Sequence, residues 1–289
     1  MSKTRTGGFP VGFRRGGTAW QKDLNSLIAF ARQAGLEFID LNRDADTAGK
    51  TVAEAGFRLG SVDLPDWTGL ASADKAKRDK AAAVNSQYIR ACAALGTKCF
   101  FVAVMAEDAA TPRAESYKYA VEGYGALAPA LEQTGSWVVM EGWPGPTVFV
   151  TTPETYRAFL RDCPARMAVN YDPSHLIRMG IDPIRFLREF APQVRHVHAK
   201  DTEVYPEAIY EFGYQTPALF AKGHGYGGHA WRYTIPGHGQ MRWKEAFSIL
   251  RDAGYQGGIS IELEDENFNG TEAGEKEALT WSCRFLASC

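Results

Sequence analysis

The sequence predicts a single (β/α)8 barrel, also called a TIM barrel, that spans residues 1–289 as one domain and has a long loop after its seventh strand. Short apolar runs alternate with helix-like stretches eight times, and no change in composition marks a second domain. No GxGxxG fingerprint follows the first run, which disfavours an open-sheet dinucleotide-binding fold.

The strands are predicted where short apolar runs are bounded by turn residues. They fall at residues 9–15, 37–41, 58–64, 98–104, 137–143, 167–172, 194–201 and 257–265. Helices are expected where apolar residues recur at helical spacing, as in the stretch that Gly35 ends. They fall at 19–35, near 46–56, before Gly96, at 113–133, after a cap at 151–154, near 183–190, from near Met241 and from about 272.

One connection is much longer than the others. Residues 202–240 follow the seventh strand, whereas loops in such barrels usually run about 2–6 residues. The segment is rich in aromatic residues and glycine, and it leaves the face where barrel enzymes keep their active sites. We expect this loop to cover the barrel mouth or to complete the site of a neighbouring subunit.

The composition excludes several classes of protein. The chain has 32 basic and 34 acidic residues, a net charge of -2 and no basic stripe, so we expect no nucleic-acid partner. No apolar run reaches membrane-spanning length, which predicts no membrane partner. Five scattered cysteines without a CxxC pair indicate free thiols in a reducing compartment, so we expect a cytoplasmic protein.

Polar residues end four consecutive predicted strands. Glu141, Asp172, His198 and Glu262 each stand where side chains converge on the barrel mouth. Three carboxylates without a cation between them would repel one another strongly. We therefore predict that these four residues bind one divalent metal ion. Oxygen ligands with one imidazole favour Mn²⁺ first, with Mg²⁺, Co²⁺ or Zn²⁺ as alternatives.

Each residue also has an ordinary structural interpretation. A strand-end glutamate is usually solvated or salt-bridged, and Asp172 before Pro173 could start a turn. His196 is expected to be a core histidine that bonds backbone carbonyls. Because polar residues stand at the ends of four consecutive strands, a shared metal site is favoured over a separate structural role for each residue. Glu264 shares a strand face with Glu262, so we interpret Glu262 as the ligand and Glu264 as an acid at the rim.

Five motifs carry a resemblance to a known family. In chain order they are VVMEGW, NYDPSHL, HVHAKD, PGHGQMRW and SIELED. Together they resemble the sugar phosphate isomerase/epimerase superfamily, whose fold is a xylose isomerase-like TIM barrel and which includes ketose 3-epimerases, inosose dehydratases and type IV endonucleases. The motifs cover the fifth to eighth strands, and the first half is similar by topology.

The resemblance implies roles for individual residues. Glu141, Asp172, His198 and Glu262 match the metal ligands, His175 a substrate-contacting histidine, and Lys200 the polar residue above the metal. The PGHGQMRW stretch looks like a glycine-rich substrate loop, which gives His238 an expected substrate contact. Met241 and Arg242 replace the apolar–acidic pair that is usual there. Trp143 is a further substrate-contact candidate, because sugars stack on aromatic rings; packing of such rings against the barrel is the alternative.

The implied function is a metal-dependent sugar isomerase or epimerase. Glu141 and Glu262 are expected to exchange a proton with the carbon beside a sugar carbonyl, through an enediolate. Elimination from the same enolate would instead give a dehydratase or a keto-glycoside lyase or hydrolase.

Two other classes remain open. One is a type IV endonuclease-like nuclease, whose multi-zinc centre needs more histidines than the six present. The other is a non-catalytic sugar-binding subunit. The expected partner is a small-molecule sugar, and the chain could form a homodimer or tetramer.

Overall fold

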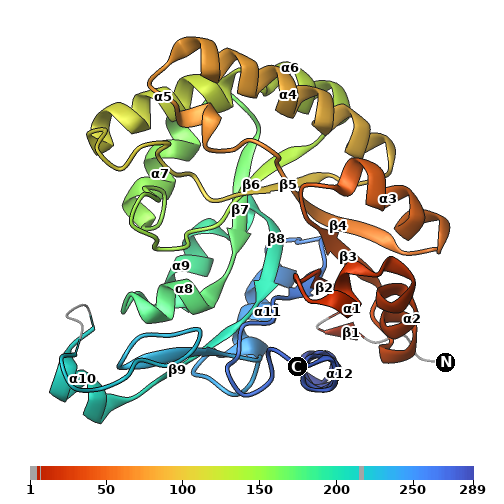
Figure 1. The fold of residues 1–289 in the computed structure, drawn as a ribbon, viewed down its shortest axis with the longest axis vertical. Helices are drawn as coiled ribbons and strands as arrows, with labels where there is room; N and C mark the ends of the chain where they lie inside the picture. The colour runs from red at the N-terminus through yellow and green to blue at the C-terminus, as the bar shows by residue number, and fades with distance from the viewer. Residues whose placement is uncertain (1–4, 7, 215–217) are drawn as a thin grey trace. The chain divides into compact units, whose positions relative to one another are not determined.

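The protein is described by a computed structural model that covers residues 5–6, 8–214 and 218–289. Its parallel strands follow the order β2-β11-β8-β7-β6-β5-β4-β3, and β2 also pairs with β3. This pairing closes the sheet, so the predicted (β/α)8 barrel is confirmed (Figure 1). That residues 1–289 form one domain stays a prediction.

Every predicted strand position contains a strand. The barrel strands are β2 (Phe9–Arg14), β3 (Phe38–Leu41), β4 (Arg58–Asp63), β5 (Cys99–Val102), β6 (Trp137–Met140), β7 (Met167–Tyr171), β8 (Val194–Ala199) and β11 (Ile259–Ile261). A short strand β1 (Arg5–Thr6) pairs antiparallel with β2. The last barrel strand is shorter than expected, so Glu262 and Glu264 follow it and do not lie within it.

The helices also lie near their predicted positions, except the short helix at residues 173–178, which the sequence did not predict. They are α1 (Ala19–Lys22), α2 (Leu24–Ala34), α3 (Ala45–Glu54), α4 (Lys75–Ala94), α5 (Arg113–Gly125), α6 (Ala128–Thr134), α7 (Pro153–Asp162), α8 (Pro173–Arg178), α9 (Pro183–Phe190), α11 (Trp243–Asp252) and α12 (Glu272–Ser288). The first predicted helix is divided at Asp23, because this side chain accepts a hydrogen bond from Asn25 N and caps α2. Among the described residues, none of the helices is both long and apolar enough to pass through a membrane.

The chain forms two compact units, which are Asp40–Asn170 with Gln193–His196, and Met1–Ile39 with Tyr171–Pro192 and Val197–Cys289. In the first of these units, β4, β5 and β6 pair in parallel, and α4 and α6 pack side by side outside them (Figure 1). Phe101, Val139 and Ala168 form a buried cluster there. Strands β5 and β6 are apolar on both faces, as expected for parallel strands covered by helices.

His196 is buried in this unit, as predicted, and one of its ring nitrogens has a carboxylate partner. Its Nε2 lies 2.8 Å from Oδ2 of Asp40, and Oδ1 of the same carboxylate accepts a hydrogen bond of 2.7 Å from Ser61 N. His196 therefore takes part in a buried carboxylate–imidazole pair that the sequence did not predict, and a bond from its ring to a backbone carbonyl stays a prediction. Two polar groups that would each be costly to bury alone satisfy each other here.

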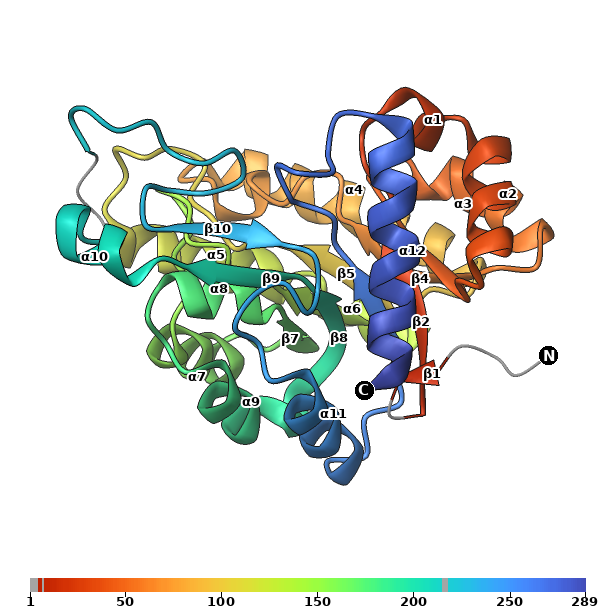
Figure 2. The same cartoon turned by 90° about the horizontal axis from the view of Figure 1, so that it is seen from below.

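In the other unit, β11 lies between β2 and β8. Ser260 stands opposite Gly12 on one side and opposite His198 on the other. The C-terminal helix α12 packs along β2 (Figure 2). Its Glu275 is buried, and Oε2 accepts hydrogen bonds from the side chains of Thr18, Trp20 and Gln21. This carboxylate therefore fixes the segment after β2 to the last helix.

The long segment after β8 is not a plain loop. Strands β9 (Asp201–Val204) and β10 (Trp231–Thr234) form an antiparallel pair, and helix α10 (Pro206–Phe212) follows β9 (Figure 2). Residues 215–217 of this segment lie outside the described residues.

The two ends of the insertion meet at the buried side chain of Asp201. Its Oδ1 accepts hydrogen bonds from the backbone nitrogens of Thr202 and Met241. Its Oδ2 accepts from Gly237 N and from Trp243 Nε1. Burial raises the pKa of this carboxyl although these hydrogen bonds oppose the shift. One carboxylate thus closes the base of the insertion.

Glu275→Gln should destabilise the protein by about 1–3 kcal/mol, since an amide cannot accept all the hydrogen bonds that this carboxylate accepts. Burial opposes ionisation, but the hydrogen bonds outweigh it and lower the pKa of Glu275. A carboxylate whose pKa is lower in the folded than in the unfolded protein stabilises the fold at pH values above its unfolded-state pKa. This stabilisation is lost as the pH falls through the folded-state pKa. Urea unfolding at neutral and acidic pH should therefore show a difference between the variant and the parent that shrinks below about pH 4.5. The matched control is Glu277→Gln, at an exposed position on the same helix. An equal effect of both substitutions would show that the hydrogen bonds of Glu275 do not stabilise the fold.

Candidate active site

Asp172 has two roles because its oxygens face different partners. It is the N-cap of α8, where Oδ1 accepts hydrogen bonds of 2.8 Å from Ser174 N and 2.6 Å from Ser174 Oγ. Pro173 at the first helical position suits this cap. The Asp-Pro step, for which a turn was the alternative interpretation, is therefore a helix start. Oδ2 lies on the other side, 3.3 Å from Lys200 Nζ.

His198 and Glu262 lie beside Asp172. One ligand atom from each of these three side chains lies within 4.8 Å of the others. His198 Nδ1 is 3.6 Å from Glu262 Oε2, and His198 is fully buried in β8. Two carboxylates and an imidazole at this spacing form a donor set of the kind that a divalent cation accepts. The chemistry of these residues therefore fits a metal ion.

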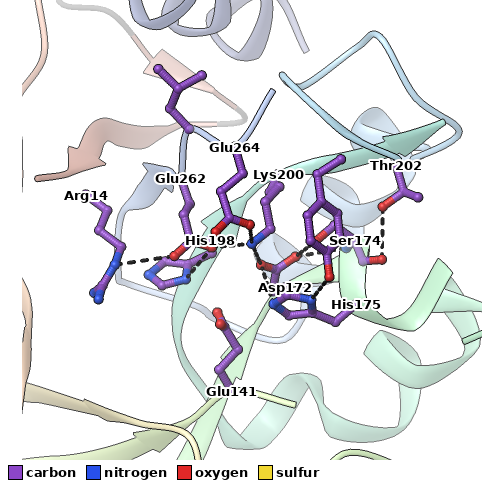
Figure 3. Close-up of polar contacts among 12 residues, drawn as sticks. Arg14, Glu141, Asp172, Ser174, His175, His198, Lys200, Thr202, Glu262 and Glu264 are labelled. Carbon is purple, nitrogen blue, oxygen red and sulfur yellow. Dashed lines mark hydrogen bonds and ion pairs between the residues drawn. The ribbon is translucent and has the colours of Figure 1, made fainter. Parts of the chain in front are cut away.

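The ammonium group of Lys200 stands among the carboxylates (Figure 3). Nζ is 2.5 Å from Glu262 Oε2 and 2.9 Å from Glu264 Oε2. Only 1% of Lys200 is exposed, so its charge depends on these partners. Nζ also lies 4.6 Å from the ring centroid of Tyr233, which is within range of a cation–π contact.

A cavity adjoins this group in the same unit. It has a volume of about 370 Å³ and is lined by residues that include Arg14, Arg15, Tyr226, Glu262 and Glu264. Arg14 Nε lies 3.3 Å from Glu262 Oε1, on the opposite side of that carboxylate from Lys200 (Figure 3). Cavities of this size with a few convergent polar groups are typical of small-molecule sites. The site therefore has space for a ligand beside Glu262.

His175 is held by a residue of the insertion. Its Nδ1 lies 2.7 Å from the hydroxyl of Tyr233 in β10, and its Nε2 is 3.4 Å from Asp172 Oδ2. Arg178 NH1 donates a hydrogen bond of 2.8 Å to the same hydroxyl. Burial raises the pKa of Tyr233, although the charges of Lys200 and Arg178 oppose the shift, so this tyrosine keeps its proton at neutral pH.

Glu141 belongs to the other unit. It is 4% exposed, directly follows β6, and its Oε2 accepts a hydrogen bond of 2.7 Å from Asn170 Nδ2. Strand β6 pairs in parallel with β7, with Met140 opposite Val169. Glu141 therefore stands at the carboxyl end of its strand, as the sequence predicted.

The other predicted substrate residues have different surroundings. Trp143 is 39% exposed in the unit that contains Glu141. Exposed His238 packs its ring against Trp281, at 4.5 Å between centroids, and near Phe268. The substrate contact of His238 stays a prediction. Glu264 forms an ion pair of 2.9 Å with Lys200, and its role as an acid at the rim stays a prediction.

Sequence reasoning did not single out Tyr233 and Ser174. Tyr233 lies in a segment crowded with aromatic residues, and nothing in the pattern separated it from its neighbours. The strand pairing that directs it at His175 depends on contacts across the insertion. Ser174 had a weak signal, because a serine two residues after an N-cap aspartate is suitably placed to bond it.

The chain has relatives among known enzymes. It is 28% identical over 152 residues to the inosose dehydratase of Clostridium tetani. These residues cover 53% of this chain and 48% of that protein. The chain spans about half the length of the curated relatives that it matches.

Solved structures share its fold over nearly the full length. A D-psicose 3-epimerase, crystallised in the presence of D-fructose, superposes with a TM-score of 0.71 at 19% identity, covering 96% of this chain and 97% of that one. A xylose isomerase-like TIM barrel protein from Mycobacterium smegmatis, in complex with magnesium, gives 0.66 at 14% identity and covers 97% of both chains. At these identities the likeness concerns the fold.

A family match covers most of the sequence. The family described as "Xylose isomerase-like TIM barrel" matches residues 28–289, which include every residue of the group around Lys200 except Arg14. The barrel topology and the cluster of carboxylates and imidazoles agree with this match. The chain belongs to the xylose isomerase-like TIM barrel family.

Proposed function

We propose that the protein is a divalent-metal-dependent sugar isomerase or epimerase that moves a proton at the carbon beside a carbonyl of a ketose or keto-sugar derivative. The observation that carries the proposal is the close approach of Asp172, His198 and Glu262, whose ligand atoms lie within 4.8 Å of one another. The family includes relatives named as dehydratases and epimerases, which supports sugar chemistry of this type.

Glu141 completes the proposed ligand set. Its strand is the neighbour of β7, and Asn170, which donates to Glu141, precedes Asp172 by two residues. The carboxyl ends of adjacent parallel strands are expected at one edge of a barrel, and on this ground we propose Glu141 as a further ligand. Three carboxylates and one imidazole suit Mn²⁺ first and Mg²⁺ or Co²⁺ next.

A divalent cation at this site would polarise a sugar carbonyl and the hydroxyl beside it, which makes the intervening C–H more acidic. Glu262 is the proposed base on one face of that carbon, and Glu141 returns a proton on the other. Arg14 and Lys200 fix the carboxylate of Glu262 from two sides, at 3.3 Å and 2.5 Å. His175 is the proposed hydrogen-bonding partner of a sugar oxygen, and the nearness of its ring to Asp172 supports this role.

Elimination is the second candidate reaction. If a leaving group sits β to the carbonyl, the same deprotonation expels it, and the protein would act as a dehydratase or a keto-glycoside lyase. The similarity to an inosose dehydratase favours this candidate. Product analysis separates the two, since elimination gives an unsaturated product and epimerisation conserves the formula of the sugar.

His198→Ala should lower the affinity for Mn²⁺ by at least about 100-fold, because the carboxylates lose the only imidazole among the proposed ligands. Metal content of the purified full chain and isothermal titration with Mn²⁺ are the measurements. His229→Ala is the control, since His229 bonds the carbonyl of Ala221 within the insertion. Stoichiometric metal and unchanged affinity in His198→Ala would refute the site.

Glu262→Gln and Glu141→Gln should each reduce proton exchange by roughly 10²–10⁴-fold, because an amide retains an oxygen ligand but is no base. The measurement is incorporation of solvent deuterium into a panel of ketoses and keto-glycosides, with bound metal determined in parallel. Glu277→Gln is the surface control. Turnover of the true substrate by the parent enzyme with neither deuterium uptake nor a primary isotope effect would exclude proton transfer.

Lys200→Met should strengthen metal binding by about tenfold or more, which corresponds to about 1.4 kcal/mol. The Lys200 ammonium competes with a cation for Glu262 Oε2, and removing it leaves buried carboxylates that a metal then neutralises. Calorimetric titration with Mg²⁺ tests this, with the exposed Lys244→Met as control. Equal or weaker binding by Lys200→Met would show that the lysine does not compete.

A further inference from the structure

Contacts from Arg178 to Tyr233 and from Tyr233 to His175 determine which ring nitrogen of His175 carries a hydrogen. Arg178 NH1 lies 2.8 Å from the Tyr233 hydroxyl, and a guanidinium always donates. The hydroxyl oxygen is therefore an acceptor toward Arg178. The guanidinium is held in place, because its Cζ lies 4.2 Å from the ring centroid of Trp231 on the same strand as Tyr233.

The proton of the Tyr233 hydroxyl also needs an acceptor, because the residue is only 4% exposed. Within the described part of the chain, the acceptor in hydrogen-bond range of this hydroxyl is His175 Nδ1, at 2.7 Å. An Nδ1 that accepts carries no hydrogen of its own. If Nδ1 donated instead, the tyrosine proton would be buried without an acceptor.

We propose that Tyr233, supplied by the inserted segment, is a positioning residue that holds His175 as the tautomer protonated on Nε2. The ring then presents an N–H on the side of Asp172 Oδ2, which lies 3.4 Å away. His175 consequently acts as a hydrogen-bond donor at the site. This hydrogen assignment follows from the contacts alone and does not depend on the proposed function.

A donor at this position selects the chemistry of the ligand group that faces it. An Nε2–H bonds a carbonyl oxygen, an alkoxide-like oxygen or a hydroxyl lone pair, and it cannot accept the proton of a hydroxyl. A histidine of fixed tautomer keeps this preference without reorganisation when a ligand enters. The insertion thereby contributes to specificity through Tyr233, in addition to any covering role.

The test is the long-range ¹H–¹⁵N spectrum of the histidine rings in the full chain, with Mg²⁺ and again with chelator. His175 is assigned by the signals that disappear in His175→Gln. We expect an unprotonated Nδ1 and a protonated Nε2 in the parent protein. In Tyr233→Phe the Nδ1 resonance should shift toward that of a nitrogen without a hydrogen bond, because its donor is lost. The exposed Tyr210→Phe of α10 is the matched control and should change nothing.

Arg178→Met is the second variant, which keeps a long side chain over Trp231 but removes the donor to Tyr233. The tyrosine oxygen then becomes free to accept, so a share of Nδ1-protonated His175 should appear. A protonated Nδ1 in the parent protein overturns the proposal, and so does a His175 spectrum that neither variant changes. Neither readout requires turnover, so a failure here is separate from a failure of the proposed reaction.

Discussion

Carboxylates that share a buried site need positive charge close to them, and this requirement organises the region around Asp172 and Glu262. The protein meets it with Lys200, a lysine with 1% exposure whose ammonium lies within 3.3 Å of three carboxylates. Arg14 adds a second cation on the far side of Glu262. A divalent metal, if bound as proposed, would enter a site that already balances charge, and its affinity would depend on how easily the Lys200 ammonium gives up its contact with Glu262.

The acids after β11 illustrate how one short stretch serves several purposes. Glu262 faces His198 and Arg14, and Glu264 binds Lys200. Asp265 is fully buried and binds Arg232 of β10, while its other oxygen accepts from Ile235 N. The stretch therefore supplies a candidate ligand, a counter-ion and an anchor for the insertion. The insertion is thus tied to the strand end that carries the proposed chemistry.

Much of this organisation could be predicted because it depends on local patterns. The strands of a parallel barrel are buried on both faces and therefore read as apolar runs, and Thr152 and Pro153 mark the start of α7 in the sequence. Asp172, His198 and Glu262 could be proposed as metal ligands because each follows or ends an apolar run, and the ends of barrel strands converge on one mouth.

Other features depend on partners far along the chain, and no local pattern contains them. Asp40 and His196 lie 156 residues apart, and the pairing of β9 with β10 spans the insertion. Helix α8 was not predicted, because its six residues leave too little pattern to recognise. The contact between Tyr233 and His175 depends on that long-range strand pairing and so required the structure.

The four hydrogen bonds that Asp201 accepts separate the insertion into a fixed base and a variable remainder. The entropy of closing a loop grows only with the logarithm of its length, so residues between β9 and β10 can be added or removed at little thermodynamic cost once the base is closed. Natural variation and engineering could thus exchange the outer part as a module, while Tyr233 stays registered against His175. The barrel would then stay constant, while changes in the outer part of this one insertion alter which ligands are preferred.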